Sequence, residues 1–178
     1  ASNYLSKKVN NISFKKSFIL KDIDFRFDQK QILNKINLEI RPGDKVGIIG
    51  ETGSGKSTLV NIILGLLKPL NGEIIIDGSK LESIRAWQNL IAYVPQNVIL
   101  HDISLIENIA FGIDRNKINI DRVKKAIKLA MLEEFIKSHE DNFNIRVGER
   151  GEEISGGEAQ RIGIARAFYR DSKVLILD

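Results

Sequence analysis

The feature that most constrains how this chain can fold is a glycine-rich loop, residues 50–58, which lies between the apolar runs 46–49 and 59–64. Its pattern, G-x-x-x-x-G-K-[ST], is typical of a phosphate-binding loop when a strand precedes it and a helix follows it. Glycines let the backbone turn tightly and bring several N–H groups up to an anion at the positive end of the helix. The pattern therefore predicts a strand at 46–49, a helix through 59–64 and a site for nucleotide phosphates between them.

The loop contains the side chains that nucleotide chemistry requires. Lys56 can reach the β- and γ-phosphates, and the hydroxyl of Ser57 can ligate Mg²⁺. The alternative, a glycine-rich turn that carries a lysine by chance, does not account for all the fixed positions and the flanking apolar runs. The predicted phosphate-binding residues are Gly50, Glu51, Thr52, Gly53, Ser54, Gly55, Lys56, Ser57 and Thr58.

Length and composition favour one globular domain, with room for a subdomain. The chain has 178 residues, of which 43% are hydrophobic and 28% are charged, as in ordinary soluble proteins. Because no run of 18 or more apolar residues occurs, we expect no membrane-spanning helix, and the first residues do not have the pattern of a signal peptide. Cysteine is absent, which excludes disulfides and thiolate metal sites and favours the cytosol.

Basic residues are concentrated at the N-terminal end. Residues 1–45 carry ten Lys or Arg against five Asp or Glu, in a chain of net charge +4. Such a segment could meet nucleic acid or an anionic membrane surface. Because the lysines alternate with apolar residues and form no block, we favour the alternative of a solvated, strand-rich edge.

Alternation of apolar and polar residues predicts several strands in the N-terminal half. Residues 1–20 are polar and irregular, and we interpret them as a linker followed by a weak strand. Two hairpin-like strands are expected at 23–27 and 31–40, and together with the strand before the glycine-rich loop they would form a mixed sheet. Further strands are expected at 73–77 and 91–94.

Helical spacing dominates the region that follows. Apolar residues at 120–131 recur at helical spacing with lysines outside, which indicates an amphipathic helix. The region from about 97 to 150 is therefore expected to be mostly helical. The expected helices are 81–90, 104–111, 120–131 and 132–139.

The C-terminal segment ends in a strand followed by a carboxylate. Ser155 and Glu158 have the spacing of a capping box at the start of a helix that continues to about Arg170. The apolar run 174–177 predicts a buried parallel strand with Asp178 at its carboxyl end, where ligands bind in open α/β sheets. A carboxylate there can hold a phosphate-bound Mg²⁺ through water.

Three signals occur in order along the chain: the phosphate loop, Gln96 after a short strand, and 155–157 one strand before Asp178. Together they resemble the ATP-binding-cassette (ABC) ATPases over nearly the whole chain from Asp24. Gln96 alone, or the serine and glycines alone, would be weak evidence, whereas the set in this order and spacing is specific.

The resemblance implies a fold and two cofactors. The fold class would be α/β, with a P-loop NTPase core of mixed and parallel sheet and helices, truncated after the strand that carries the second Walker motif. An N-terminal antiparallel β portion and a helical subdomain at about 97–165 would complete it. The ABC ATPase domain would occupy 21–178, after a linker at 1–20, and would bind ATP and Mg²⁺.

The resemblance also implies roles for individual residues. Phe27 would stack on adenine, although the family more often has tyrosine there and core packing is the alternative. Gln96 would ligate Mg²⁺ and sense a transmembrane partner, and Asp178 would be the acidic residue of the second Walker motif. The implied catalytic residues are Lys56, Gln96 and Asp178, and the implied metal ligands are Ser57, Gln96 and Asp178.

The segment around Ser155 resembles the family signature, which closes on the γ-phosphate of a nucleotide held by the other subunit. The implied residues of this set are Ser155, Gly156, Gly157 and Glu158. The sequence departs from the family at Ile154 and Glu158, where leucine and glutamine are usual. A carboxylate near a γ-phosphate would be repulsive unless Glu158 points back into its capping box.

Two further segments resemble exporter-type cassettes. Residues 147–151 match the segment typical of exporters before the signature, and 93–97 leading to 107–109 matches the exporter pattern around the coupling surface. His101 stands where phenylalanine is common.

An exporter cassette implies partners and a location. The partners would be a six-helix membrane domain, usually on the same polypeptide, and a second ABC domain in a head-to-tail homodimer or heterodimer. The cassette would lie at the cytoplasmic face of the membrane, use ATP hydrolysis to drive transport, and bind no nucleic acid. A lipid, a lipid-linked saccharide, a peptide or a drug would all be compatible as the transported substrate.

Members of the family place the glutamate that polarises the attacking water directly after the position of Asp178, followed by a histidine that contacts the γ-phosphate. We therefore expect the chain by itself to bind ATP weakly at best and to hydrolyse essentially none. Steady turnover that is abolished by Lys56→Ala would contradict this expectation.

Two other classes of P-loop protein are alternatives. A soluble ABC ATPase of chromosome maintenance, repair or translation would have nucleic acid as its partner, but the coiled-coil class has hundreds of residues between the glutamine and the signature, against 59 from Gln96 to Ser155 here. A P-loop GTPase would read guanine with Asn-Lys-x-Asp, and neither 34–37 nor 116–119 supplies the aspartate.

Overall fold

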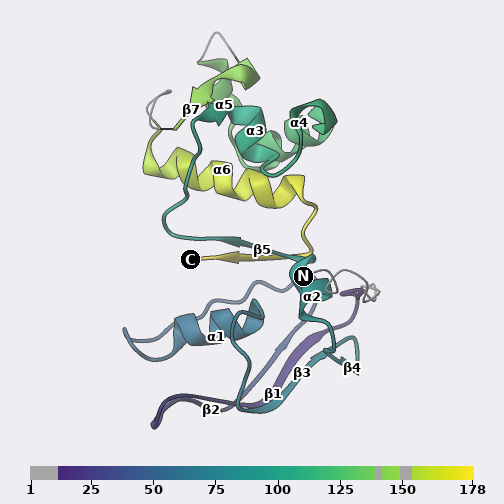
Figure 1. Cartoon of the computed structure of the whole chain (residues 1–178), viewed down its shortest axis with the longest axis vertical. Coiled ribbons are helices and arrows are strands. Elements are labelled where there is room, and N and C mark those ends of the chain that lie inside the picture. Colours follow the sequence, from purple (N-terminus) through teal and green to yellow (C-terminus); the bar gives the residue numbers. More distant parts are fainter. Residues whose placement is uncertain (1–11, 139–141, 149–153) are drawn as a thin grey trace, which may run out of the picture. The chain divides into compact units, whose positions relative to one another are not determined.

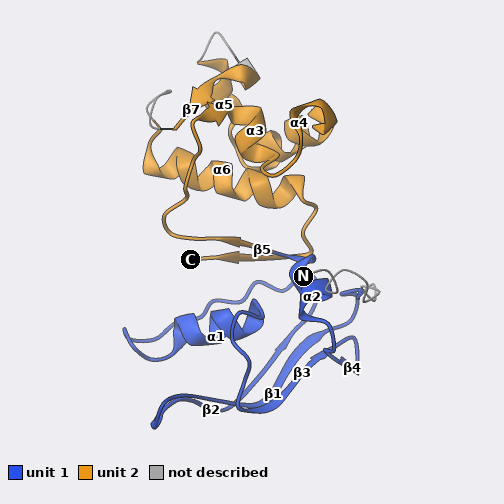
Figure 2. Cartoon of the chain, in the orientation of Figure 1, with its two compact units in different colours: residues 1–91 blue, residues 92–178 orange. Residues whose placement is uncertain are grey.

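A computed structural model describes residues 12–138, 142–148 and 154–178. The chain divides into two compact units, with the boundary after Ile91 (Figure 2). Most of the expected linker, residues 1–11, lies outside the described residues, and so do 149–151 of the exporter-type segment and His139 at the end of an expected helix.

The first unit is built on an antiparallel sheet with the strand order β2-β1-β3-β4 (Figure 1). The central strand β1 buries alternate side chains, including Phe18 and Leu20, as an amphipathic strand should. The hairpin that the alternation predicted is therefore confirmed, and β1 is longer than expected. The strands are β1 (Phe18–Phe27), β2 (Lys30–Ile40), β3 (Asn71–Ile76) and β4 (Ser79–Lys80).

Two helices complete the first unit. Helix α1 (Lys56–Ile63) follows the glycine-rich loop, as predicted, and buries Ile62 and Ile63. Helix α2 (Ile84–Gln88) is shorter than the expected helix at 81–90, because the Ser83 side chain accepts the N–H of Ala86 and so caps the first turn.

The strand predicted at 46–49 is wrong: this segment is not a strand. Ile49 is 94% exposed and Val46 is 49% exposed. The apolar run suggested a buried strand, but a strand forms only where its backbone N–H and C=O groups find a neighbouring strand. None of the strands in the described residues pairs with 46–49.

The second unit packs helices around one apolar core (Figure 1). Helix α6 lies along α3 and α4. The amphipathic helix predicted for 120–131 is confirmed as far as Leu129, since α4 buries Val123, Ala126 and Ile127, whereas Met131 lies beyond its end and is exposed. The helices are α3 (Leu105–Ile109), α4 (Ile120–Leu129), α5 (Glu133–Lys137) and α6 (Gly156–Tyr169), with 3-10 turns at Arg115–Lys117 and Asn142–Asn144.

Two short strand pairs frame these helices. Strand β5 (Ile91–Val94) pairs with β8 (Val174–Leu177), and β6 (Ile103–Ser104) pairs with β7 (Arg146–Val147). The expectation that the strand at 174–177 is buried is wrong, because its leucines are exposed, Leu177 to 60%. Along β8 the exposed Leu175 and Leu177 alternate with the half-buried Val174 and Ile176, so one face of the strand is exposed.

No helix in the described ranges has both the length and the apolar composition that crossing a lipid bilayer requires.

Candidate nucleotide-binding site

The glycine-rich loop adopts a backbone that only glycine accommodates at its closest point. Gly55 has a φ of +95°, and a Cβ there would come within 3.0 Å of Leu33 Cδ2 and 3.2 Å of the Ile32 carbonyl oxygen on β2. At Gly50 a Cβ would lie 2.8 Å from the Ser54 hydroxyl. The loop is therefore packed closely against β2 and against itself, as the sequence pattern required.

Helix α1 begins at this loop without a side-chain cap. Its N-cap is Gly55, which has no side chain to accept the N–H groups of the first turn. Those N–H groups have no partner within the helix, and the helix dipole makes this end positive. Backbone donors without a side-chain acceptor at a positive helix end fit the oxygens of a phosphate group.

The side chain of Lys56 is held against the loop by hydrogen bonds to the backbone of the loop. The ammonium donates to the carbonyl oxygens of Gly50 at 2.8 Å and Glu51 at 2.6 Å. These contacts keep the positive charge beside the helix end. Ser57 is exposed, whereas Thr58 is buried on the core side of α1, so Thr58 is the member of the predicted set whose side chain does not face the surface.

Phe27, the predicted adenine-stacking residue, ends β1 opposite Lys30. Its ring is 52% exposed and makes an edge contact with buried Phe25, with the ring centroids 5.0 Å apart. The alternative of core packing for Phe27 is wrong, because Phe25 occupies the buried position. An exposed aromatic ring supported from below is able to stack on a base.

In the second unit Asp178 lies at the end of the β5–β8 pair. Its N–H donates to the carbonyl oxygen of Val94 at 3.1 Å, and its carboxylate accepts the hydroxyl of Tyr93 at 2.7 Å. This hydrogen bond to Asp178, followed by burial and by the charge of the carboxylate, raises the pKa of Tyr93. The hydroxyl therefore stays protonated, and remains a donor, at neutral pH.

Gln96 is exposed two residues beyond Val94, so it follows the same end of β5. Tyr93 was not predicted as a site residue: the sequence placed it in a strand and in the exporter-like segment 93–97, without a role of its own. The signal that was present is a polar tip on an otherwise apolar strand, directly before the motif that contains Gln96.

The signature segment begins α6 in the geometry that the sequence suggested. Ser155 is the N-cap, and its hydroxyl accepts the N–H of Glu158 at 3.3 Å. The Glu158 carboxylate accepts the Ser155 N–H at 2.9 Å and the Ser155 hydroxyl at 2.6 Å. The prediction that Glu158 turns back into a capping box is confirmed. A Cβ on Gly156 or Gly157 would meet nothing within 4 Å, so the glycines present open backbone.

A buried polar network joins α6 to the segment that follows Gln96. Asn108 is fully buried, and its side chain bonds to both backbone groups of His101. The Arg166 guanidinium donates to the Asn108 carbonyl and side-chain oxygens, at 2.7 and 2.9 Å, and to the Ile99 carbonyl oxygen at 2.9 Å. Burial lowers the pKa of Arg166, and its guanidinium also lies over the ring of Phe111.

The predicted site residues thus fall into two groups. The first unit holds the loop residues 50–58 together with Phe27, and the second holds Gln96, 155–158 and Asp178. Within the second unit the structure brings Asp178 to β5 next to Tyr93, a contact that no motif announced.

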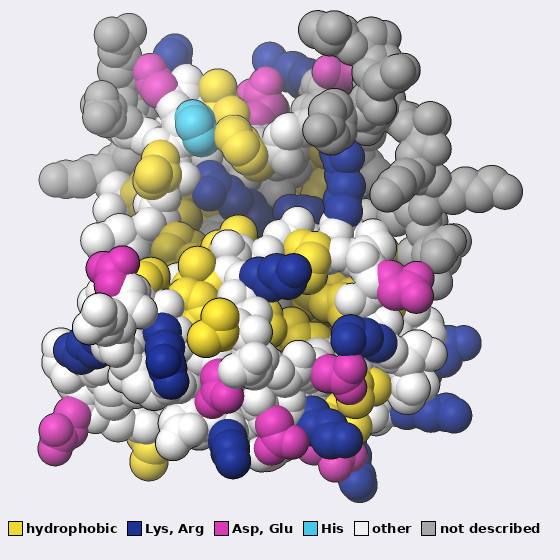
Figure 3. Space-filling view, turned by 60° about the horizontal axis from the view of Figure 1, so that its bottom comes forward, with side chains coloured by type: hydrophobic (Ala, Val, Ile, Leu, Met, Phe, Trp, Pro, Cys, Tyr) yellow, Lys and Arg dark blue, Asp and Glu magenta, His cyan; other side chains and the backbone are white. Residues whose placement is uncertain are grey.

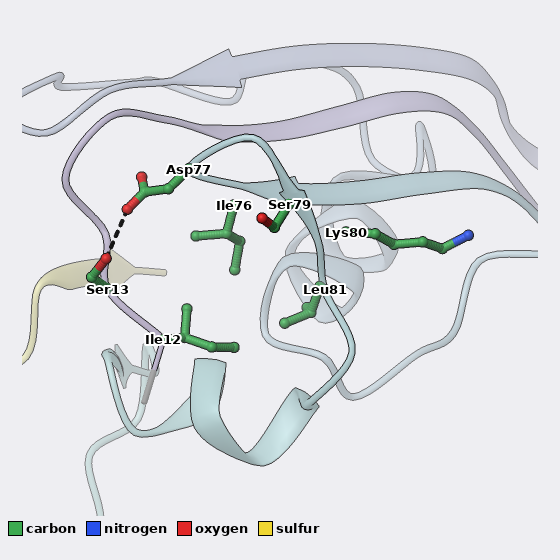
Figure 4. Close-up of a pocket in the computed structure, with 7 residues that line it drawn as sticks. All are labelled: Ile12, Ser13, Ile76, Asp77, Ser79, Lys80 and Leu81. Carbon is green, nitrogen blue, oxygen red and sulfur yellow. Dashed lines mark hydrogen bonds between the residues drawn. The ribbon is translucent and has the colours of Figure 1, made fainter. Parts of the chain in front are cut away.

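A separate cavity in the first unit has a volume of about 230 Å³ (Figure 4). None of the predicted site residues lines it. Asp77, on its wall, accepts a hydrogen bond from the Ser13 hydroxyl at 3.0 Å. Because this carboxylate is already engaged by the protein, the cavity does not extend the candidate site. The lining residues are Ile12, Ser13, Ile76, Asp77, Ser79, Lys80 and Leu81.

Surface charges are mixed. On the face shown in Figure 3, the Lys and Arg side chains lie among Asp, Glu and apolar side chains and do not gather into one stripe. A basic stripe is the electrostatic footprint of nucleic-acid binding. The described residues on this face do not form such a stripe.

A family model described as "ABC transporter" matches residues 33–178. The chain is 37% identical over 165 residues to the multidrug resistance protein pgp-1 of Caenorhabditis elegans, a match that covers 90% of this chain and 12% of that protein. It is 36% identical over 161 residues to the ATP-dependent lipid A-core flippase of Ralstonia nicotianae, covering 88% and 27% of the two proteins.

A similar solved structure is described as that of a bacterial Atm1-family ABC exporter with ATP bound. The TM-score is 0.80 at 30% sequence identity, and the match covers 100% of this chain and 31% of the exporter chain. The chain thus spans well under a third of the two relatives named above. One relative is a flippase and the solved structure is an ABC exporter by name, and the alternative of a nucleic-acid ATPase has no support among them.

Proposed function

Because the chain belongs to the ABC transporter family, we propose that it is the ATP-binding cassette of an exporter, and that ATP hydrolysis at this cassette drives transport. The observation that carries the proposal is the glycine-rich loop, where Lys56 lies beside an uncapped helix start. This arrangement suits the terminal phosphates of a nucleotide. The exposed ring of Phe27 in the same unit would receive the base.

In this proposal Mg²⁺ would be held by Ser57, Gln96 and Asp178, and would supply positive charge on the β- and γ-phosphates. These residues fit a hard cation, since they offer a hydroxyl oxygen, an amide oxygen and a carboxylate. Lys56 would bind the same phosphates from the loop side. The protein would thus bind the nucleotide mainly through its phosphates. Phosphoryl transfer needs positive charge at these phosphates.

The partners follow from the open signature segment. We infer that Ser155, Gly156 and Gly157 would contact the γ-phosphate held by a second cassette, in a head-to-tail pair. ATP bound between two such surfaces would favour the closed pair, and hydrolysis would release it, because binding differs between the two states. The segment 97–111 would pass this change to a transmembrane domain, with the cassette at the cytoplasmic face.

The test is calorimetric titration of the intact protein with Mg-ATP. Lys56→Ala should lower the affinity at least about tenfold, which corresponds to the loss of charge-assisted contacts to phosphate. Lys68→Ala removes an exposed lysine from the same unit and should leave the affinity unchanged. Equal affinities for the three proteins would overturn the proposal.

We further expect that this chain by itself hydrolyses essentially no ATP. It stays a prediction, which steady-state phosphate release from the chain would test, with Lys56→Ala as the background.

A further inference from the structure

Strand β5 presents consecutive residues to two different faces. The side chain of Val94 lies against α6, since a Cβ added to Gly163 would come within 2.9 Å of it. Consecutive side chains in a strand point to opposite faces, so Tyr93 lies on the face of β5 that α6 does not cover. Its ring is 41% exposed there.

Asp178 meets Tyr93 because the two strands are held in register. The N–H of Asp178 donates to the Val94 carbonyl oxygen at 3.1 Å. This contact sets the Asp178 side chain beside the end of β5, where the Tyr93 hydroxyl donates to Oδ2 at 2.7 Å. No other side chain in the described ranges donates to this carboxylate.

We propose that Tyr93 is a positioning residue for Asp178: its hydroxyl holds one carboxylate oxygen and leaves the other for the metal ion of bound Mg-ATP. The proposal deepens the function proposed above and rests on it. A free aspartate side chain rotates broadly about its terminal torsion, and a hydrogen bond to an ionised acceptor is strong enough to restrict that rotation.

A tyrosine suits this task better than a cationic residue would. The hydroxyl is a neutral donor, so it orients the carboxylate without neutralising the charge that would attract a metal. A lysine or arginine in its place would compete with the cation for the same oxygens. Phenylalanine would fill the same volume and would carry no donor, which makes Tyr93→Phe a clean test.

The experiment compares three forms of the intact protein: the wild type, Tyr93→Phe, and the control Tyr169→Phe. Tyr169 also uses its hydroxyl, which accepts the Asn119 N–H at 3.2 Å, but it belongs to the buried helical core of the same unit. The control therefore removes a bonded hydroxyl without touching Asp178. Mn²⁺ binding in the presence of ATP is followed by electron paramagnetic resonance, and ATP binding in EDTA by calorimetry.

Tyr93→Phe should raise the half-saturating Mn²⁺ concentration about threefold to tenfold, the range that corresponds to the net contribution of one ordinary hydrogen bond. It should leave ATP binding in EDTA unchanged, because the loop residues do not depend on Tyr93. Tyr169→Phe should change neither quantity. If Tyr93 only supported the fold, Tyr93→Phe would not affect Mn²⁺ binding while leaving ATP binding in EDTA unchanged.

Two results would overturn the inference alone: an unchanged Mn²⁺ dependence in Tyr93→Phe, or equal shifts in Tyr93→Phe and Tyr169→Phe. A wild type that binds no ATP, with or without metal, would overturn the proposed function as well. The two failures are therefore distinguishable in one set of titrations.

Discussion

The indole N–H of Trp87 donates a hydrogen bond of 2.7 Å to the carbonyl oxygen of Ile63, the last residue of α1. Trp87 is 1% exposed. Its ring stacks on Phe18 with a centroid distance of 4.9 Å and meets the edge of Phe14 at 6.1 Å. One side chain of α2 therefore joins the start of β1 to the end of the helix that follows the glycine-rich loop.

Trp87→Phe should lower the free energy of unfolding by about 2–3 kcal/mol, because it removes the bond to a buried carbonyl oxygen and leaves unfilled volume in the core. Urea denaturation of the two proteins measures this difference. The control Phe14→Leu loses only the edge contact and should cost about 1 kcal/mol or less. Equal losses in the two variants would show that the indole bond contributes little.

The Asp77 carboxylate fastens the segment that precedes β1. It accepts the backbone N–H groups of Lys15, Lys16 and Ser17 and the hydroxyl of Ser13. Burial by itself raises the pKa of Asp77, but these hydrogen bonds outweigh it and hold the pKa below its ordinary value. The folded state therefore favours the ionised form.

Asp77→Asn should lower the free energy of unfolding at pH 7 by about 1–2 kcal/mol, since the amide cannot accept at both positions. Because the folded-state pKa is depressed, the stabilisation is fully present above the unfolded-state pKa of about 3.9 and is lost as the pH falls through the folded-state value. Denaturation between pH 7 and pH 3 should show the two proteins converging in acid. A difference that does not depend on pH would contradict this account.

Glu158→Gln should strengthen ATP-dependent pairing of cassettes about twofold to fivefold at low salt, because it removes a partly exposed negative charge beside the open signature. Glutamine also serves in a capping box, so the melting temperature should hardly change. Sedimentation with ATP under conditions that block hydrolysis measures the pairing.

The chain offers a matched control for this change. Ser104 and Glu107 form the same capping box at the start of α3, so Glu107→Gln alters an identical local structure outside the signature. It should leave pairing unchanged. If both variants change pairing alike, the effect comes from helix capping and not from the signature.

Arg166→Lys should lower the melting temperature by several degrees, equivalent to about 2 kcal/mol. A lysine cannot reproduce the fork of donors that reaches Asn108 and Ile99, and Asn108 is buried. Arg161→Lys, at an exposed position of the same helix, is the control and should be nearly neutral. Differential scanning calorimetry compares the two, and equal melting temperatures would show that the network is dispensable.

Much of the fold follows from short-range patterns. The hairpin of β1 and β2 was predicted from period-two alternation, and α4 from its amphipathic spacing. The capping box of Ser155 and Glu158 was predicted because its two members are three residues apart and interact through the backbone between them. The glycine-rich loop belongs with these, since its backbone depends on residues that lack a Cβ.

The failures were long-range. The apolar run 46–49 predicted a strand, and 174–177 predicted burial, yet the first has no strand partner among the described residues and the second is half exposed. Apolar composition indicates that a segment favours burial against another part of the chain, but it does not indicate which part packs there.

By itself, the sequence determined the local elements, the loop and the order of motifs, because each depends on residues a few positions apart. Only the tertiary structure decided the contacts of Tyr93 with Asp178, of Trp87 with Ile63 and of Asp77 with the segment before β1. These partners are separated by 85, 24 and 61 residues in the chain. A hydrogen bond between them exists only where packing brings the two segments together, and no local period records that.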